Sequence, residues 1–228
     1  MNDASSRHSK LILTCSTLGA GLNLASSVRA RGIRRTTFMF VLGTGLPAAG
    51  ELLATGPLKL LRHRLRYRIA GVPFAILLGW YCVIHGSFVV AGRISNRFFP
   101  DEGARISTLP TVAALVATAL DLILDPAGLE AGLWEWSADG VYASGIQGAN
   151  GCNGVPLVNY LGWIALVGGV VYALSNERED EADEFLPALL LIPLYLATTW
   201  WAIKRRRFRY LLYSALFPVA LYSALENR

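Results

Sequence analysis

The sequence is poor in the residues that build metal centres, disulfide frameworks and soluble surfaces. It holds three histidines and three cysteines among 228 residues, and the spacing of Cys15, Cys82 and Cys152 shows no pairs. We therefore expect neither a disulfide framework nor a metal cluster. Only 16% of the residues are charged, whereas 54% are hydrophobic. Soluble domains usually carry more charge and less apolar surface than this, so the composition indicates a membrane protein.

Oxidative chemistry is disfavoured by what is missing. His8, His63 and His85 form no histidine cluster that would hold iron. No glycine-rich nucleotide fingerprint follows a candidate strand. We therefore expect an activity that needs no cofactor.

Apolar segments long enough to cross a bilayer are abundant. Seven runs of about 18 residues or more are candidate spans: residues 11–28, 36–56, 69–91, 108–125, 155–175, 185–203 and 208–225. The first is rich in hydroxylated residues, and the last is short. The sequence predicts an all-α, polytopic membrane helix bundle of about seven helices. We expect one transmembrane domain over residues 1–228, with a polar tail at residues 1–10.

The net charge of +5 gathers in linkers between these spans, at residues 29–35, 59–68 and 204–209. Basic runs beside apolar spans set topology and touch anionic headgroups, so we expect membrane lipids rather than nucleic acid as their partner. With seven spans, twelve lysines and arginines fall on the N-terminal side of the membrane and nine on the other. The N-terminus is therefore predicted to be cytoplasmic.

Two aspartates end the fourth apolar run. Asp121 and Asp125 are four residues apart, so they share one helix face. A carboxylate near hydrocarbon is costly, which makes an intramembrane acid a functional candidate. Pro126 follows at once and predicts the end of the helix.

A short repeat relates this region to an earlier one. Residues 71–80 read GVPFAILLGW, and residues 154–163 read GVPLVNYLGW. The offset of 83 residues spans two predicted helices, so both copies should start at the same membrane face, with proline in the first helical turn. Glu51 closes the helix before the first copy, so it should approach the same face as the aspartates. Alternatively, Glu51 snorkels or pairs with an arginine of residues 62–68.

Residues 126–153 contain no lysine or arginine, and their glycines and aromatics predict a folded interfacial loop. Trp134, Trp136 and Tyr142 form either an aromatic belt at headgroup level or a lid over a pocket. Asn159 lies about two turns into the next helix, where a buried amide needs partners. A hydrogen bond from this amide to an aspartate of the preceding helix would serve.

The other half of the predicted bundle offers fewer polar groups. His85 lies about 21 Å along its helix from Gly71, and it fits either a packing role or a proton relay. Residues 177–184 resemble a solvated acidic loop. Because the acids gather at one face while the far half offers only His85, the pattern favours an enzyme acting on a lipid over a transporter.

The motifs DLILDP, GLWEW and GVPLVNYLGW, in this order, resemble those of the carotenoid hydratase family. This family includes the carotenoid 1',2'-hydratases and bisanhydrobacterioruberin hydratase, which add water to the terminal double bond of acyclic carotenoid ends. The resemblance is strongest over residues 119–163 and weaker over residues 48–81. It implies a prokaryotic plasma membrane and a lipophilic carotenoid substrate, with other carotenoid biosynthesis enzymes as further candidate partners.

The resemblance also gives the acids a task. Asp121 and Asp125 would be the acid–base pair, one protonating the alkene and the other activating water, with Glu51 in support. Aromatic faces near the site would stabilise the cation formed. The expected substrate-binding residues are Trp80, Trp134, Trp136, Tyr142, Asn159 and Trp163. Two other readings stay open: a proton- or cation-coupled transporter, and a noncatalytic carotenoid-binding subunit.

Overall fold

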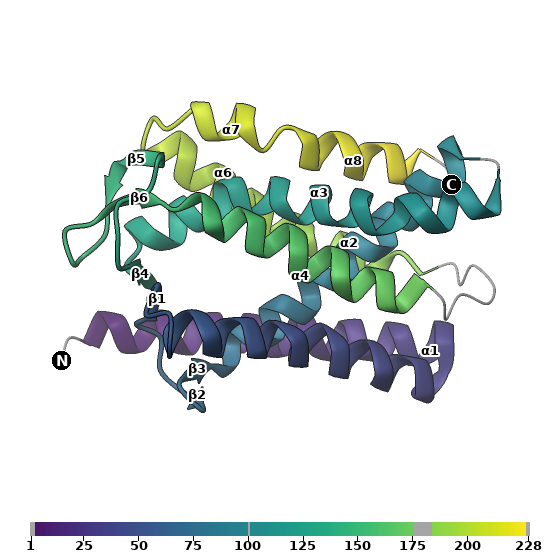
Figure 1. Ribbon diagram of the computed structural model, residues 1–228, viewed down its shortest axis with the longest axis horizontal. Coiled ribbons are helices and arrows are strands. Elements are labelled where there is room, and N and C mark those ends of the chain that lie inside the picture. The colour runs from purple at the N-terminus through teal and green to yellow at the C-terminus, as the bar shows by residue number, and fades with distance from the viewer. Residues whose placement is uncertain (1–2, 100, 176–183, 227–228) are drawn as a thin grey trace.

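The computed structural model describes residues 3–99, 101–175 and 184–226, and most of them form long helices packed side by side (Figure 1). Among these described residues, five helices are long and apolar enough to cross a membrane. This confirms the predicted all-α membrane bundle. The helices are α1 (Asp3–Thr55), α2 (Phe74–Phe98), α3 (Glu102–Glu130), α4 (Leu157–Ser175), α5 (Leu186–Leu189), α6 (Leu191–Lys204), α7 (Arg209–Tyr213) and α8 (Leu216–Leu225).

Helix α1 contains both of the first two predicted spans. Its apolar part covers 47 residues, about 70 Å if it were straight, which is more than twice the hydrocarbon thickness. The chain instead folds back at Gly32, whose φ of 78° favours glycine, and its two halves lie side by side (Figure 1). The Thr36 hydroxyl donates to Ser27 across this turn, at 3.0 Å. Residues 3–10, expected as a polar tail, are the first residues of the helix.

The C-terminal spans are more interrupted than the sequence predicts. Helices α5 and α6 together cover Leu186–Lys204 and form one candidate span. The last predicted span, residues 208–225, is divided into α7 and α8, and α8 is an apolar helix of ten residues. Helices α2 and α3 are central, since α2 packs against α1, α3, α5 and α8.

The prediction that Pro126 ends its helix is wrong, because α3 continues to Glu130. A proline inside a helix leaves the carbonyl four residues earlier without its N–H donor. Here the Tyr142 hydroxyl donates to that carbonyl, of Leu122, at 2.6 Å. The helix ends where Gly132 adopts a φ of 68°, and the backbone N–H of the next residue bonds back to Gly128 at 2.9 Å.

Three small antiparallel strand pairs, which the sequence did not predict, gather at one end of the bundle (Figure 1). They pair β1 (Leu61–His63) with β4 (Trp134–Trp136), β2 (Arg68–Ile69) with β3 (Val72–Pro73), and β5 (Tyr142–Gln147) with β6 (Asn153–Val155). The first pair joins the segment after α1 to the segment after α3, with His63 opposite Trp134. The predicted interfacial loop is therefore folded and bound to another part of the chain.

The predicted parallel repeat is present. Helix α2 begins directly after Pro73, and helix α4 begins directly after Pro156. Both helices start at the end of the bundle that carries the strands (Figure 1). The first glycines of the two copies, Gly71 and Gly154, both have positive φ values, of 91° and 74°. Gly71 lies in the turn between β2 and β3, whereas Gly154 lies within β6, so the two copies share a glycine conformation and a helix start.

Candidate functional site

The two aspartates of α3 lie side by side inside the protein. Asp121 is 2% exposed and Asp125 is 3% exposed. The amide of Asn159, from α4, donates one hydrogen bond to each of them: its Nδ2 lies 2.8 Å from Oδ2 of Asp121 and 2.8 Å from Oδ2 of Asp125. An amide nitrogen carries two hydrogens, so one side chain holds both carboxyl groups together. The predicted helix-to-helix bond from Asn159 is thus present twice.

Indoles from β4 complete this neighbourhood. The Trp134 indole donates to Oδ1 of Asp125. Its ring lies against the backbone of α3 at Gly128, where the Cβ of any larger residue would overlap with it. Trp136, two residues further along the strand, is 5% exposed, and its indole nitrogen faces Asp125 without meeting hydrogen-bond geometry. The aromatic loop therefore covers the aspartates from the end of the bundle.

Glu51 belongs to the same end of the protein. It is buried near the end of α1, where its Oε1 accepts the indole N–H of Trp80 at 2.9 Å and its Oε2 lies 2.8 Å from Nε2 of His63. The alternative that it snorkels or pairs with an arginine of residues 62–68 is therefore wrong, because its partner from that segment is a histidine. Sequence reasoning missed His63, although it is the one histidine in an arginine-rich linker.

A stacked pair of tryptophans links the two halves of the repeat. Trp80 and Trp163 occupy equivalent positions in the two GVP copies, and their ring centroids are 4.1 Å apart with an interplanar angle of 32°. Trp80 also binds Glu51, so the first half meets the second at the candidate site. Glu51 acts electrostatically on both aspartates. The three acids thus gather at one end of the bundle, as the repeat predicted.

Tyr142 contacts both helices that carry the site, α3 and α4. Its hydroxyl is engaged with the carbonyl of Leu122, and its ring packs edge-on against Tyr160, with centroids 5.2 Å apart. Burial raises the pKa of the Tyr142 phenol, which keeps the hydroxyl protonated as a donor. Tyr142 thus stabilises α3 at Leu122, between Asp121 and Asp125.

The other half of the bundle is more polar than the sequence indicated. Residues 177–183 of the expected solvated loop lie outside the described residues, but Glu184 is 3% exposed and therefore buried. Its Oε2 lies 2.8 Å from Nε of Arg31 and 3.3 Å from Nε2 of His85. Burial alone would raise the pKa of Glu184, but hydrogen bonds and charges from His85 and Arg31 outweigh it and lower this pKa to about 2. His85 is thus part of an ionic cluster, not an isolated polar residue.

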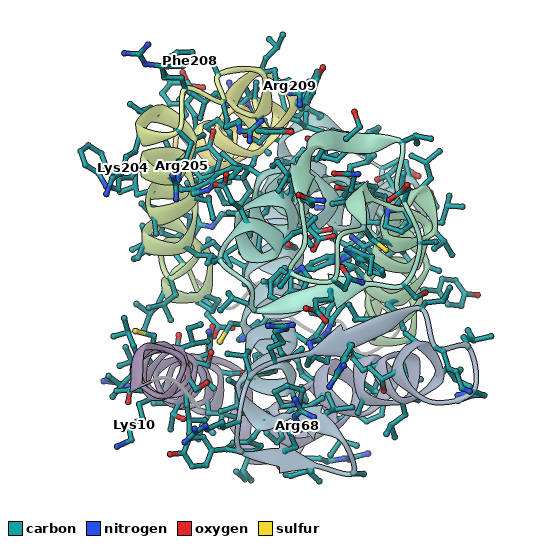
Figure 2. All side chains as sticks on the ribbon, turned by 90° about the vertical axis from the view of Figure 1, so that its left-hand side faces the viewer. Lys10, Arg68, Lys204, Arg205, Phe208 and Arg209 are labelled. Carbon is teal, nitrogen blue, oxygen red and sulfur yellow. The ribbon has the colours of Figure 1, made fainter. Side chains whose placement is uncertain are left out.

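Basic side chains lie around the end of the bundle that carries the site. Figure 2 views this end and shows Lys10, Arg68, Lys204, Arg205 and Arg209 towards its rim. The N-terminus lies at the same end (Figure 1). In the orientation that the charge distribution predicts, this end faces the cytoplasm.

The chain was compared with known proteins. No curated protein and no solved structure matches it. Residues 12–221 match a protein family described as carotenoid biosynthesis protein. Because this match covers nearly the whole chain, including every residue of the candidate site, the protein belongs to the carotenoid biosynthesis protein family.

Proposed function

We propose that this protein is a hydratase that adds water to the terminal carbon–carbon double bond of an acyclic carotenoid end group. One observation carries the proposal: two buried aspartates, bridged by the amide of Asn159, lie beside indole rings at one end of a membrane bundle. Acid-catalysed hydration needs one carboxyl group that gives a proton and another that accepts one. Family membership supplies the substrate class.

The hydrogen bonds favour a division of labour between the two aspartates. Asp125 accepts N–H groups from Trp134 and Asn159, whereas Asp121 accepts one from Asn159. Donors pointing at a carboxyl group stabilise its ionised form. We therefore assign Asp121 as the acid that protonates the alkene and Asp125 as the base that takes a proton from the attacking water. Glu51 acts on both aspartates, so it supports the pair and does not distinguish its two members.

The reaction forms a tertiary cation between these two steps. Addition of a proton to the CH carbon of the terminal double bond leaves the charge on the carbon that bears two methyl groups. The faces of Trp80, Trp163 and Trp134 are the nearby groups able to stabilise that charge. Water then bonds to the cationic carbon and loses a proton to Asp125. Hydration is neither oxidation nor reduction, so the scheme needs no cofactor.

A proton- or cation-coupled transporter is the second candidate. The buried cluster of Arg31, His85 and Glu184 favours it, because ionisable groups are then present in both halves of the bundle. A noncatalytic carotenoid-binding subunit would keep the aromatic loop but would not require the aspartates. In a transporter, substitution of Asp121 would abolish ion flux in liposomes. In a hydratase, the same substitution would abolish formation of the hydrated carotenoid, and neither the wild type nor the variant would transport ions.

The direct test is expression in a prokaryotic host whose membranes contain lycopene or γ-carotene, followed by mass analysis of the pigments. A gain of one water for each modified end is expected. Membranes incubated under argon in water enriched with oxygen-18 should place the label in the new hydroxyl group. In heavy water, one nonexchangeable deuterium should enter each modified end. A hydroxyl group that forms only in air, and that takes its label from oxygen-18 gas in a parallel incubation, would refute the hydratase and indicate a hydroxylase.

A further inference from the structure

Two buried polar atoms beside the aspartates have no hydrogen-bond partner within residues 3–99, 101–175 and 184–226. They are the indole nitrogen of Trp136 and the hydroxyl of Tyr160. Trp136 is 5% exposed and Tyr160 is 7% exposed, so bulk water does not serve them well. Buried polar groups in proteins are nearly always hydrogen-bonded, and each exception calls for an explanation.

The two side chains belong to the neighbourhood of the same carboxyl groups but come from different elements. Trp134 and Trp136 are two residues apart in β4, so their side chains project to the same face of the strand, the face on which Trp134 reaches Asp125. Tyr160 directly follows Asn159 in α4, and its ring packs against that of Tyr142, whose hydroxyl bonds to the Leu122 carbonyl next to Asp121. Trp136 and Tyr160 also pack into one apolar cluster with Ile123 of α3.

The partner of these groups has to be small and polar. An acyclic carotenoid end is a hydrocarbon, which neither accepts nor donates a conventional hydrogen bond. The cluster around the two atoms is apolar, with Ile123, Leu129, Ile146 and Val155 buried in it. The reactant that remains is water, which uses two to four polar partners when it is buried. An indole donor, a phenol and a carboxylate would fit that requirement.

We propose that Trp136 and Tyr160 hold the attacking water molecule against Asp125. The inference rests on the proposed function and names the groups that bind its second substrate. The indole N–H donates to the water oxygen, the Tyr160 hydroxyl fixes its orientation, and Asp125 accepts one of its protons. The oxygen lone pair is then free to bond to the cationic carbon.

This arrangement predicts how the cation divides between two fates. With water in place, the cation gains an oxygen atom and Asp125 takes a proton from that water. Without positioned water, the cation instead loses a proton from a neighbouring carbon to a carboxylate and returns to an alkene. In heavy water the second route introduces deuterium into unhydrated carotenoid. The ratio of hydrate to deuterium-exchanged alkene therefore reports water capture separately from protonation.

The experiment measures this ratio in membranes containing Tyr160→Phe or Trp136→Phe, incubated in heavy water with an acyclic carotenoid. Each substitution keeps a ring in the apolar cluster and removes one polar atom. The matched control is Tyr172→Phe, on the same helix as Tyr160 but 68% exposed. We expect the ratio to fall by about threefold to tenfold in both site variants, the scale of one lost hydrogen bond, and to stay unchanged in the control.

The outcomes separate this inference from the proposed function. A wild-type protein that yields neither hydrate nor exchange refutes the hydratase itself. An active wild type with an unchanged ratio in the site variants refutes the water site. An equal fall of hydrate and exchange in these variants also refutes it, because such a loss reflects the acid or the fold instead of water capture. Either site variant alone is sufficient for the comparison.

Discussion

Replacing each aspartate by asparagine should have the same effect on catalysis but different effects on stability. Either substitution removes a group that transfers a proton, so hydrate formation should fall at least about a hundredfold. The folded states differ because Asp121 accepts its hydrogen bond from Asn159 at one oxygen, whereas Asp125 uses both oxygens, one for Asn159 and one for Trp134. An asparagine has a single side-chain oxygen and can replace only the first arrangement.

The expected difference in stability follows from that count. In Asp121→Asn the amide oxygen still accepts the N–H of Asn159, so the free energy of unfolding should change little. In Asp125→Asn the new NH₂ group faces a donor, which leaves a buried N–H unsatisfied at a cost of about 1–3 kcal/mol. For a chain of this size, that lowers the melting temperature by about 2–12 °C.

The assays are pigment mass analysis of membranes and thermal unfolding of the purified variants in one detergent. Wild-type turnover by Asp121→Asn would remove this residue from the mechanism. Equal melting temperatures for the two variants would refute the hydrogen-bond pattern that assigns them different roles.

Three further predictions concern the fold. Cysteine tags at Arg62 and at Asp139 should be labelled from the same side of the membrane, because β1 and β4 pair at one end of the bundle; labelling from opposite sides would contradict a site at a single face. Tyr142→Phe should destabilise the protein by about 1–3 kcal/mol. The loss should be smaller in a Pro126→Ala background, because the restored N–H of residue 126 donates to the Leu122 carbonyl. Equal losses in both backgrounds, measured by thermal unfolding, would refute this compensation. Glu184→Gln should lower the free energy of unfolding at neutral pH, because it leaves the cation of Arg31 without its buried partner. The difference from wild type should vanish as the pH is lowered through about 2, where Glu184 itself is protonated. A variant as stable as wild type at neutral pH would show that the pair contributes nothing.

The sequence alone determined the class of the protein and the end at which its acids lie. Apolar runs of span length predict membrane helices because the bilayer leaves the backbone few other structures. The repeated GVP motif fixed the direction of α2 and α4, since an even number of crossings separates its copies. Asp121 and Asp125 stood out because a helix places residues four apart on one face, which is a local property.

The tertiary structure decided which groups complete the site. Helix α3 passes Pro126 because the hydroxyl of Tyr142, a residue of a later strand, replaces the missing N–H. His63 lies in β1, which pairs with β4, and its side chain contacts Glu51. Glu184 is buried against Arg31, 153 residues earlier in the chain. Periodicity describes neighbours within one element, whereas these hydrogen bonds join elements distant in sequence. Their partners exist only once the helices are packed.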